Sequence, residues 1–182
     1  MKKNKLFIFL LLCFTAYSVT AQTKHLVSVQ KDSFIQFKMF HALHDFESKS
    51  KEGVCEIDYD QSTKLIKRVN VQVEVSTFDS GNSNRDSHAM EVIDALSYPL
   101  ASYTSSSIEQ TADSITVYGK LTFHGVTHDH TFKAAYTINN NTIIVKGGFD
   151  VSLTYYKVER PSLMLMKVDD IMKFIFVETF NL

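Results

Sequence analysis

Regular alternation of apolar and polar side chains is the feature that most constrains this chain. Val71, Val73 and Val75, for example, alternate with Gln72 and Glu74. Successive side chains of a β-strand point to opposite faces, so such segments predict strands with one buried face. The predicted inward set is Ile35, Phe37, Met39, Val71, Val73, Val75, Val117, Leu121, Phe123, Phe132, Tyr136, Phe174 and Phe176. Seven to nine such strands predict an all-β barrel or sandwich, and the aromatic inner face favours an antiparallel barrel of about eight strands.

Turn residues separate the alternating segments. Gly81, the pair His124-Gly125 and the run Asn139–Asn141 each lie between two of them, as tight reversals require. The pair Gly147-Gly148 falls inside a segment and predicts a bend or bulge. Residues 171–177 are apolar on both faces, which predicts a strand covered on both sides.

One segment departs from the alternation. Ser83 and Asp86 form a helix-capping signal, and apolar residues follow at helical spacing as far as Leu96. Tyr98-Pro99 then ends the pattern, because a residue before proline avoids the helical conformation. We expect one helix of two to three turns that covers an end or one side of the barrel.

The first residues predict export. A basic start is followed by an apolar run from Leu6 to Phe14 and by small residues before Gln22. This is the pattern of a cleaved signal peptide, with cleavage after Ala21, and the run is shorter than the roughly 20 residues of a membrane span. We expect residues 1–21 to be the signal and residues 22–182 to be one domain in the periplasm or outside the cell.

Charge and cysteine content narrow the possible partners. Residues 1–21 hold three of the 19 Lys and Arg and none of the 20 Asp and Glu, so residues 22–182 carry a net charge of −4. A mildly acidic domain without a basic tract argues against a nucleic-acid partner. Cys55 is the one cysteine left, it cannot form an internal disulfide, and its alternation with Ile57 predicts a buried thiol.

Two clusters could carry chemistry. His124, His128 and His130 fall within seven residues, which leaves a metal-dependent periplasmic enzyme as an alternative, although Gly125 turns the chain between them. Asp86 could orient His88 as a base, but no nucleophile or phosphate-binding motif accompanies the pair. The structural interpretation is that Arg85, Asp86 and His88 anchor the helix, with Arg85 bonded to the barrel wall. We expect no metal, no cofactor and no catalysis.

Physical arguments allow two kinds of barrel interior. A barrel of eight strands is wide enough to be filled by its own side chains or to hold one small ligand. Alternation does not distinguish the two, so a packed-core structural or stress-protection protein is a further alternative.

Two segments resemble a known family. Residues 76–99 contain Ser-Thr-Phe-Asp-Ser-Gly-Asn-x-x-Arg-Asp-x-His and end in Tyr-Pro, and residues 119–127 read Gly-Lys-Leu-Thr-Phe-His-Gly-Val-Thr. Both are similar to motifs of the YceI-like family of periplasmic lipid-binding proteins, and Ser33 with Phe37 fits its first long strand. The resemblance spans about residues 26–180.

The resemblance implies a lipocalin-like barrel with a helix beside it, no catalysis, and a long polyisoprenoid or similar amphiphilic lipid as partner. It places the lipid tail inside the barrel and the head group near the mouth. Where the family has an Arg-x-Asp-Phe-Gly segment, this chain has Ser152–Tyr156, so Tyr155, Tyr156 and Arg160 are candidate replacements at the mouth. The helix also lacks the family's paired aromatics. A homodimer stays open as the oligomeric state.

Overall fold

The computed structural model describes residues 22–41, 44–163 and 165–182. The predicted signal peptide, residues 1–21, lies outside this part of the chain. The strands are β1 (Thr23–Val27), β2 (Phe34–Met39), β3 (Phe46–Ser50), β4 (Val54–Asp60), β5 (Leu65–Glu74), β6 (Leu100–Gln110), β7 (Ser114–Phe123), β8 (Val126–Asn139), β9 (Thr142–Ser152), β10 (Ser162–Leu163), β11 (Met166–Lys167) and β12 (Ile171–Asn181). Two 3-10 turns, η1 (Gln30–Asp32) and η2 (Val75–Thr77), and one helix, α1 (Ser83–Val92), complete the elements.

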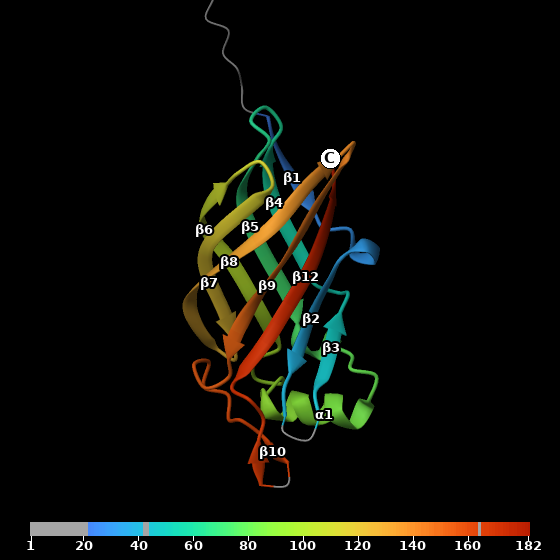
Figure 1. Cartoon of the computed structure of the whole chain (residues 1–182), viewed down its shortest axis with the longest axis vertical. Coiled ribbons are helices and arrows are strands. Elements are labelled where there is room, and N and C mark those ends of the chain that lie inside the picture. Colours follow the sequence, from blue (N-terminus) through green and yellow to red (C-terminus); the bar gives the residue numbers. More distant parts are fainter. Residues whose placement is uncertain (1–21, 42–43, 164) are drawn as a thin grey trace, which may run out of the picture.

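The main sheet is antiparallel and curls into a barrel (Figure 1). Its strand order is β1-β4-β5-β6-β7-β8-β9-β12-β2-β3, and β10 and β11 form a separate small hairpin. Ten strands exceed the predicted number of about eight because two long strands are interrupted. The turn η1 separates β1 from β2, and residues 51–53 separate β3 from β4. The predicted class, an all-β antiparallel barrel with one helix, is confirmed.

The interrupted strands also bring the two ends of the sheet together. β1 pairs with β4, while β2 pairs with both β3 and β12. Beyond β1, the Val29 N–H donates a hydrogen bond of 2.7 Å to the Thr179 carbonyl of β12. The chain from β1 to β2 therefore lies between β4 and β12 and closes the curl.

Alternation within the strands follows the prediction. On β7, Ile115, Val117 and Leu121 are each at most 9% exposed, whereas Lys120 points to solvent. The turn into β8 consists of His124 and Gly125, whose φ angles of +49° and +71° give the backbone twist that a two-residue hairpin favours.

The predicted bulge at Gly147-Gly148 is wrong. β9 pairs with β8 and β12 without a register shift, and the shifts occur at Asp58/Tyr59 and at Ser105/Ser107 instead. A Cβ on Gly147 would lie 2.7 Å from Cζ of Phe176. The glycine makes room for an aromatic ring inside the barrel rather than for a bulge.

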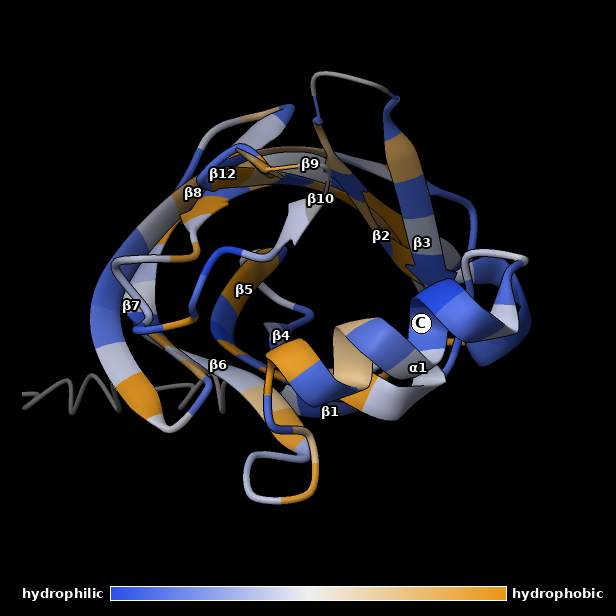
Figure 2. Cartoon of the chain, turned by 90° about the horizontal axis from the view of Figure 1, so that it is seen from below, coloured by the Kyte–Doolittle hydropathy of each residue, from blue (hydrophilic) through white to orange (hydrophobic). Residues whose placement is uncertain are grey.

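Helix α1 has the predicted length of two to three turns, but it ends before Leu96, where the apolar spacing ends. Its N-cap is Asn82, whose Oδ1 accepts a 3.1 Å hydrogen bond from the Arg85 N–H. It ends at Val92, and Asp94, with φ +45°, turns the chain out of the helix. Leu96 is consequently 99% exposed. Met90 and Ile93 pack towards the core, and Figure 2 shows α1 crossing one side of the ring of strands seen from below.

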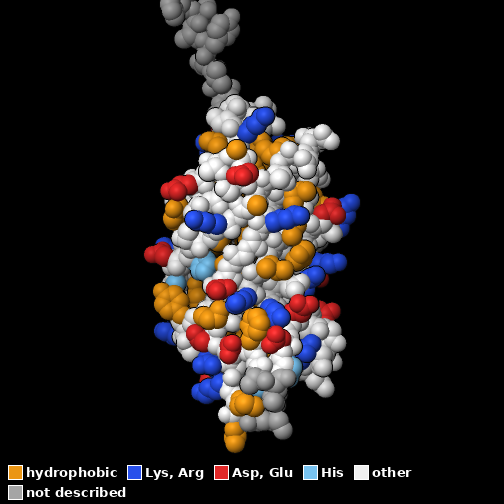
Figure 3. All heavy atoms as spheres, in the orientation of Figure 1, with side chains coloured by type: hydrophobic (Ala, Val, Ile, Leu, Met, Phe, Trp, Pro, Cys, Tyr) orange, Lys and Arg blue, Asp and Glu red, His pale blue; other side chains and the backbone are white. Residues whose placement is uncertain are grey.

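The prediction that β12 is covered on both faces is wrong, because Ile171 and Ile175 on its outer face are 37% and 51% exposed. On the face shown in Figure 3, Lys and Arg side chains are interspersed with Asp and Glu. No helix within the described ranges is long and apolar enough to cross a membrane.

Candidate functional site: an apolar cavity inside the barrel

A cavity of about 590 Å³ occupies the barrel interior. Residues of α1 line one end, which we call the mouth. Ile66 and Phe180, which are 3% and 1% exposed, line the opposite end, which we call the closed end. The volume lies within the range of small-molecule sites, roughly 300–1,000 Å³. Apolar side chains from the inward faces of the strands make up most of its wall.

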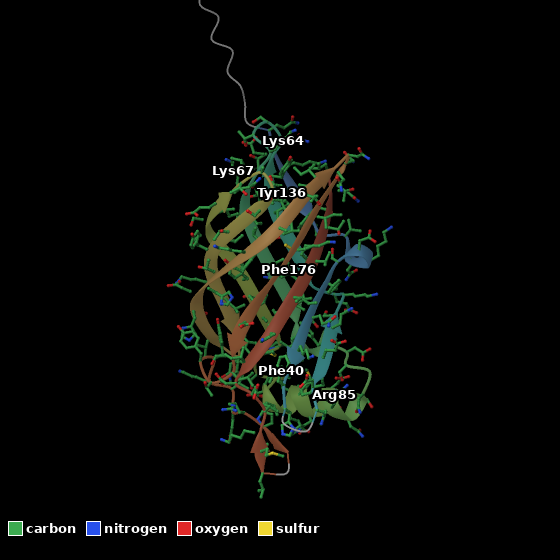
Figure 4. The ribbon with its side chains drawn as sticks, viewed as in Figure 1. Phe40, Lys64, Lys67, Arg85, Tyr136 and Phe176 are labelled. Carbon is green, nitrogen blue, oxygen red and sulfur yellow. The ribbon has the colours of Figure 1, made fainter. Side chains whose placement is uncertain are left out.

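The predicted inward set lines this cavity except for Val117 and Tyr136. Val117 is fully buried in the packing of β7. The Tyr136 hydroxyl accepts a hydrogen bond from Gln110 Nε2 (2.8 Å) and donates one to the Thr111 carbonyl (3.2 Å). Figure 4 shows Tyr136 nearer the end away from α1 than Phe176, so Tyr136 belongs to the packing that closes the barrel.

Five phenylalanines from four strands form the middle of the wall. Phe149 and Phe174 stack with ring centroids 4.8 Å apart and planes at 2°. Phe132 meets Phe176 edge-to-face at 5.5 Å, and Phe37 lies 5.8 Å from Phe174. Such ring pairs add about 0.5–1.5 kcal/mol beyond the area they bury. Sequence reasoning missed Phe149, although it shares the inward parity of Gly147 on β9.

Arg85 and Asp86 at the mouth are held by the turn that precedes α1. Arg85 donates from Nε to Ser80 Oγ (2.9 Å) and from Nη2 to the Ser80 carbonyl (2.8 Å). Asp86 accepts from the Ser80 N–H at 3.3 Å. The Arg85 guanidinium also lies 5.3 Å from the ring centre of Phe46 on β3. The hydrogen bonds of Arg85 therefore go to the turn and not to the barrel wall as predicted, and its contact with the wall is the cation–π contact.

His88 lines the mouth but does not join this anchor. Its Nδ1 lies 3.6 Å from Glu91 on the same helix, and its side chain is 66% exposed. Since Asp86 is bonded to Ser80, the structure does not pair Asp86 with His88 as a catalytic base would require.

Tyr155, Tyr156 and Arg160 do not line the cavity. Tyr155 is 57% exposed and stacks on His128 with centroids 3.7 Å apart. Tyr156 is 2% exposed, and burial raises its pKa to about 12. Arg160 donates from Nε to the Val168 carbonyl at 2.8 Å. In the structure these side chains fasten the segment between β9 and β12.

The three clustered histidines point to different partners. His124 Nδ1 lies 3.0 Å from the Tyr156 carbonyl, and His128 Nε2 lies 3.1 Å from the Tyr155 carbonyl. His130 faces the cavity beside Phe149, and burial lowers its pKa. Within the ranges that the structure describes, no three His, Cys, Asp or Glu side chains are grouped as metal ligands.

Glu178 is a second cavity residue that sequence reasoning missed. It lies on the inward face of β12, lines the cavity and is 5% exposed. Burial raises the pKa of its carboxyl to about 7, although hydrogen bonds from Ser28 and Ser33 act in the opposite direction. The sequence did carry a signal for it. Phe174, Phe176, Glu178 and Phe180 are spaced two residues apart, so all four point to the same inward face of the strand.

The two segments that carry the family resemblance meet in space. The Tyr98 ring, at the end of the first segment, packs edge-on against His124 of the second, with centroids 4.8 Å apart. A Cβ on Gly125 would lie 2.4 Å from Cε1 of Tyr98. The two motifs therefore form one contact that joins the chain after α1 to the β7–β8 turn.

Comparison with known proteins agrees with this arrangement. Protein YceI of Salmonella agona is 29% identical over 140 residues, which cover 74% of this chain and 72% of that protein. The crystal structure of Burkholderia cenocepacia BcnA matches with a TM-score of 0.75 at 19% identity, over 84% of this chain and 98% of that one. A polyisoprenoid binding domain from Saccharophagus degradans, implicated in plant cell wall breakdown, matches with a TM-score of 0.68 at 12% identity, over 88% and 99% of the two chains.

These structural likenesses show the shared fold. The model of the YceI-like domain matches residues 25–179, which is nearly the whole barrel. The chain belongs to the YceI-like domain family.

Proposed function

We propose that this protein is exported and binds an amphiphilic isoprenoid-type or similar long-chain lipid inside the barrel without catalysis. The observation that carries the proposal is the apolar cavity of about 590 Å³, walled by phenylalanine and aliphatic side chains. Burial of apolar ligand surface against such a wall is favourable by roughly 25 cal/mol per Å² before the costs of binding. The related fold of a polyisoprenoid binding domain supports the same class of ligand.

The alternatives from the sequence fit the structure less well. A packed-core structural protein does not fit an interior with a continuous cavity of this size. A metal-dependent enzyme would need His124, His128 and His130 to converge, whereas His124 and His128 hold the Tyr155–Tyr156 segment and His130 faces the interior.

Export and the cellular location rest on the sequence of residues 1–21. We propose cleavage after Ala21 and residence in the periplasm or outside the cell, where the barrel would meet its lipid. Replacing Ala21 and Val19 with arginine should leave the precursor uncleaved, which an intact-mass measurement of the purified protein would detect.

A narrowing substitution tests the cavity directly. Val71 on β5 lines the cavity, and Gln72 beside it points to solvent. We expect Val71→Phe to weaken binding of a C20 prenyl alcohol by about tenfold or more, because the added ring occupies ligand volume. Equilibrium binding measured by displacement of a fluorescent long-chain probe reports the change.

The matched control is Gln72→Phe, which adds the same ring one residue away on the outer face. It should bind the prenyl alcohol as wild type does. Equal binding by the wild type and both variants, or no binding by the wild type, would contradict the proposal.

A further inference from the structure

An isolated carboxyl group lies deep in the cavity. Glu178 pairs across β12 and β9 with Val145, and Val145 pairs with Tyr136 on β8. Tyr136 marks this level in Figure 4, toward the end of the barrel away from Arg85 of α1. The inward neighbours of Glu178 on β12 are Phe176 and Phe180, so the carboxyl interrupts an apolar wall.

The interruption between β1 and β2 supplies two hydroxyls to this carboxyl. Ser28 and Ser33 flank η1, and the hydroxyls of both act to lower the pKa of Glu178. Ser28 Oγ accepts from the Cys55 N–H (3.0 Å), and Ser33 Oγ accepts from the Thr179 N–H (3.0 Å). Each serine oxygen accepts from one backbone N–H and keeps its own O–H proton, which it can direct to Glu178.

One carboxyl oxygen is left without a partner. Oε2 of Glu178 is buried, and no donor or acceptor in the described part of the chain reaches it. A buried polar atom without a hydrogen bond is costly, and such atoms in native structures call for an explanation. Among the described residues, Tyr136 lies at the same level with its hydroxyl bonded to Gln110 and Thr111, and Cys55 lines the cavity with a pKa that burial raises.

We propose that Glu178 Oε2 binds a hydroxyl group of the ligand at the closed end of the cavity. This inference rests on the proposed lipid-binding function and specifies which lipids fit: long-chain alcohols that enter hydroxyl first. It reverses the orientation that the family resemblance implies, in which the head group stays near the mouth.

A hydroxyl fits this position better than other polar groups. It accepts a hydrogen bond when Glu178 is protonated and donates one when Glu178 is ionised, whereas a carbonyl only accepts. An ammonium group would need to lose far more hydration than a hydroxyl on entering this apolar wall. Among the described residues that line the cavity, the one Lys or Arg is Arg85, and it lies at the mouth. No cationic side chain of this lining is therefore placed to pair with an anionic ligand group at the closed end.

The test uses two lipids that differ by one oxygen atom. Wild-type protein is incubated with an equimolar excess of phytanol and phytane, free lipid is removed, and bound lipid is quantified by gas chromatography. E178M keeps the side-chain length without the oxygens, and E178Q keeps hydrogen-bonding capacity. We expect the phytanol-to-phytane ratio to fall about tenfold or more in E178M and to stay near wild type in E178Q.

Each control separates one explanation. Lys173→Met places the same new side chain on the exposed outer face of β12 and should leave the ratio unchanged. Far-UV circular dichroism verifies that each variant is folded, and if E178M does not fold, E178L replaces it.

An unchanged ratio in the apolar variant overturns the inference while leaving lipid binding intact. Failure of the wild type to bind either lipid overturns the proposed function itself. If the wild type binds phytanylamine preferentially and E178Q does not, the inference that the ligand group is a hydroxyl is wrong and the group is an amine.

Discussion

At the residue scale, Glu178 is the side chain that matters most and that sequence reasoning passed over. Alternation of apolar and polar residues marks Phe176 and Phe180 as inward but gives no such signal for the glutamate between them. The period-two rule places it inside regardless of its chemistry. Its serine partners could not be predicted, because Ser28 and Ser33 reach Glu178 only when the first strand is interrupted by η1.

Glu178 should make stability depend on pH. Burial raises its folded-state pKa from 4.5 to about 7, so the folded protein holds a proton that the unfolded chain loses. The stability should therefore fall as the pH rises from 4.5 to 7, with a total effect of about 3 kcal/mol above pH 7. Urea unfolding of the wild type and Glu178→Gln at pH 5 and pH 8 measures this. The difference in unfolding free energy, variant minus wild type, should be larger at pH 8 than at pH 5.

The control for this prediction is Glu52→Gln, which alters an exposed glutamate between β3 and β4. It should track the wild type at both pH values. If Glu178→Gln also tracks the wild type, Glu178 is not held in an environment that opposes ionisation.

At the element scale, the turns were predicted better than the ends of the helix. His124-Gly125 and Asn140-Asn141 connect strands as expected, because tight hairpins need residues that tolerate positive φ. The apolar spacing up to Leu96 overstated α1, since Asp94 leaves the helical region and no local sequence rule marked that position. The paired glycines of β9 were assigned to a bulge because the nearby rings of β12 are visible only in three dimensions.

The contact between Tyr98 and Gly125 gives a prediction for Gly125→Ala. Gly125 has φ +71°, and an added Cβ would also meet the Tyr98 ring. We expect a loss of about 2 kcal/mol or more in the free energy of unfolding, since the left-handed conformation alone costs roughly 1–2 kcal/mol. Urea unfolding provides the measurement.

Gly81→Ala isolates the backbone part of this effect. Gly81 has φ +75° with nothing within 4 Å of an added Cβ, so its loss should be the smaller of the two. Adding Tyr98→Ala to Gly125→Ala should cost less than the sum of the single changes. Equal losses at the two glycines would show that the Tyr98 contact contributes nothing.

At the scale of the whole molecule, the barrel could be predicted and its hollow interior could not. The fold follows from alternation, which specifies which side chains point inward. Whether inward side chains meet in the middle depends on strand tilt and on packing between distant strands, as in the ring pairs of Phe149 with Phe174 and Phe132 with Phe176. For that reason Val117 and Tyr136 were assigned to a ligand site that they do not reach, while Phe149 was missed.

The same limit applies to the mouth. Tyr155, Tyr156 and Arg160 were chosen because they replace a family segment, but their contacts lie with His128, the packed interior and the Val168 carbonyl. The polar residues that line the opening come from α1 and from the loops beside it, including Asn84 and His44. Only the assembled barrel brings these segments to one end.

The central claim is that the cavity carries a long-chain lipid. The most direct measurement is mass spectrometry of lipid extracted from the protein purified, without detergent, from its own host. The proposed function predicts about one long-chain lipid molecule per protein chain, depleted in Val71→Phe and retained in Gln72→Phe. Repeated recovery of lipid-free wild-type protein that also fails to take up prenyl alcohols would contradict it.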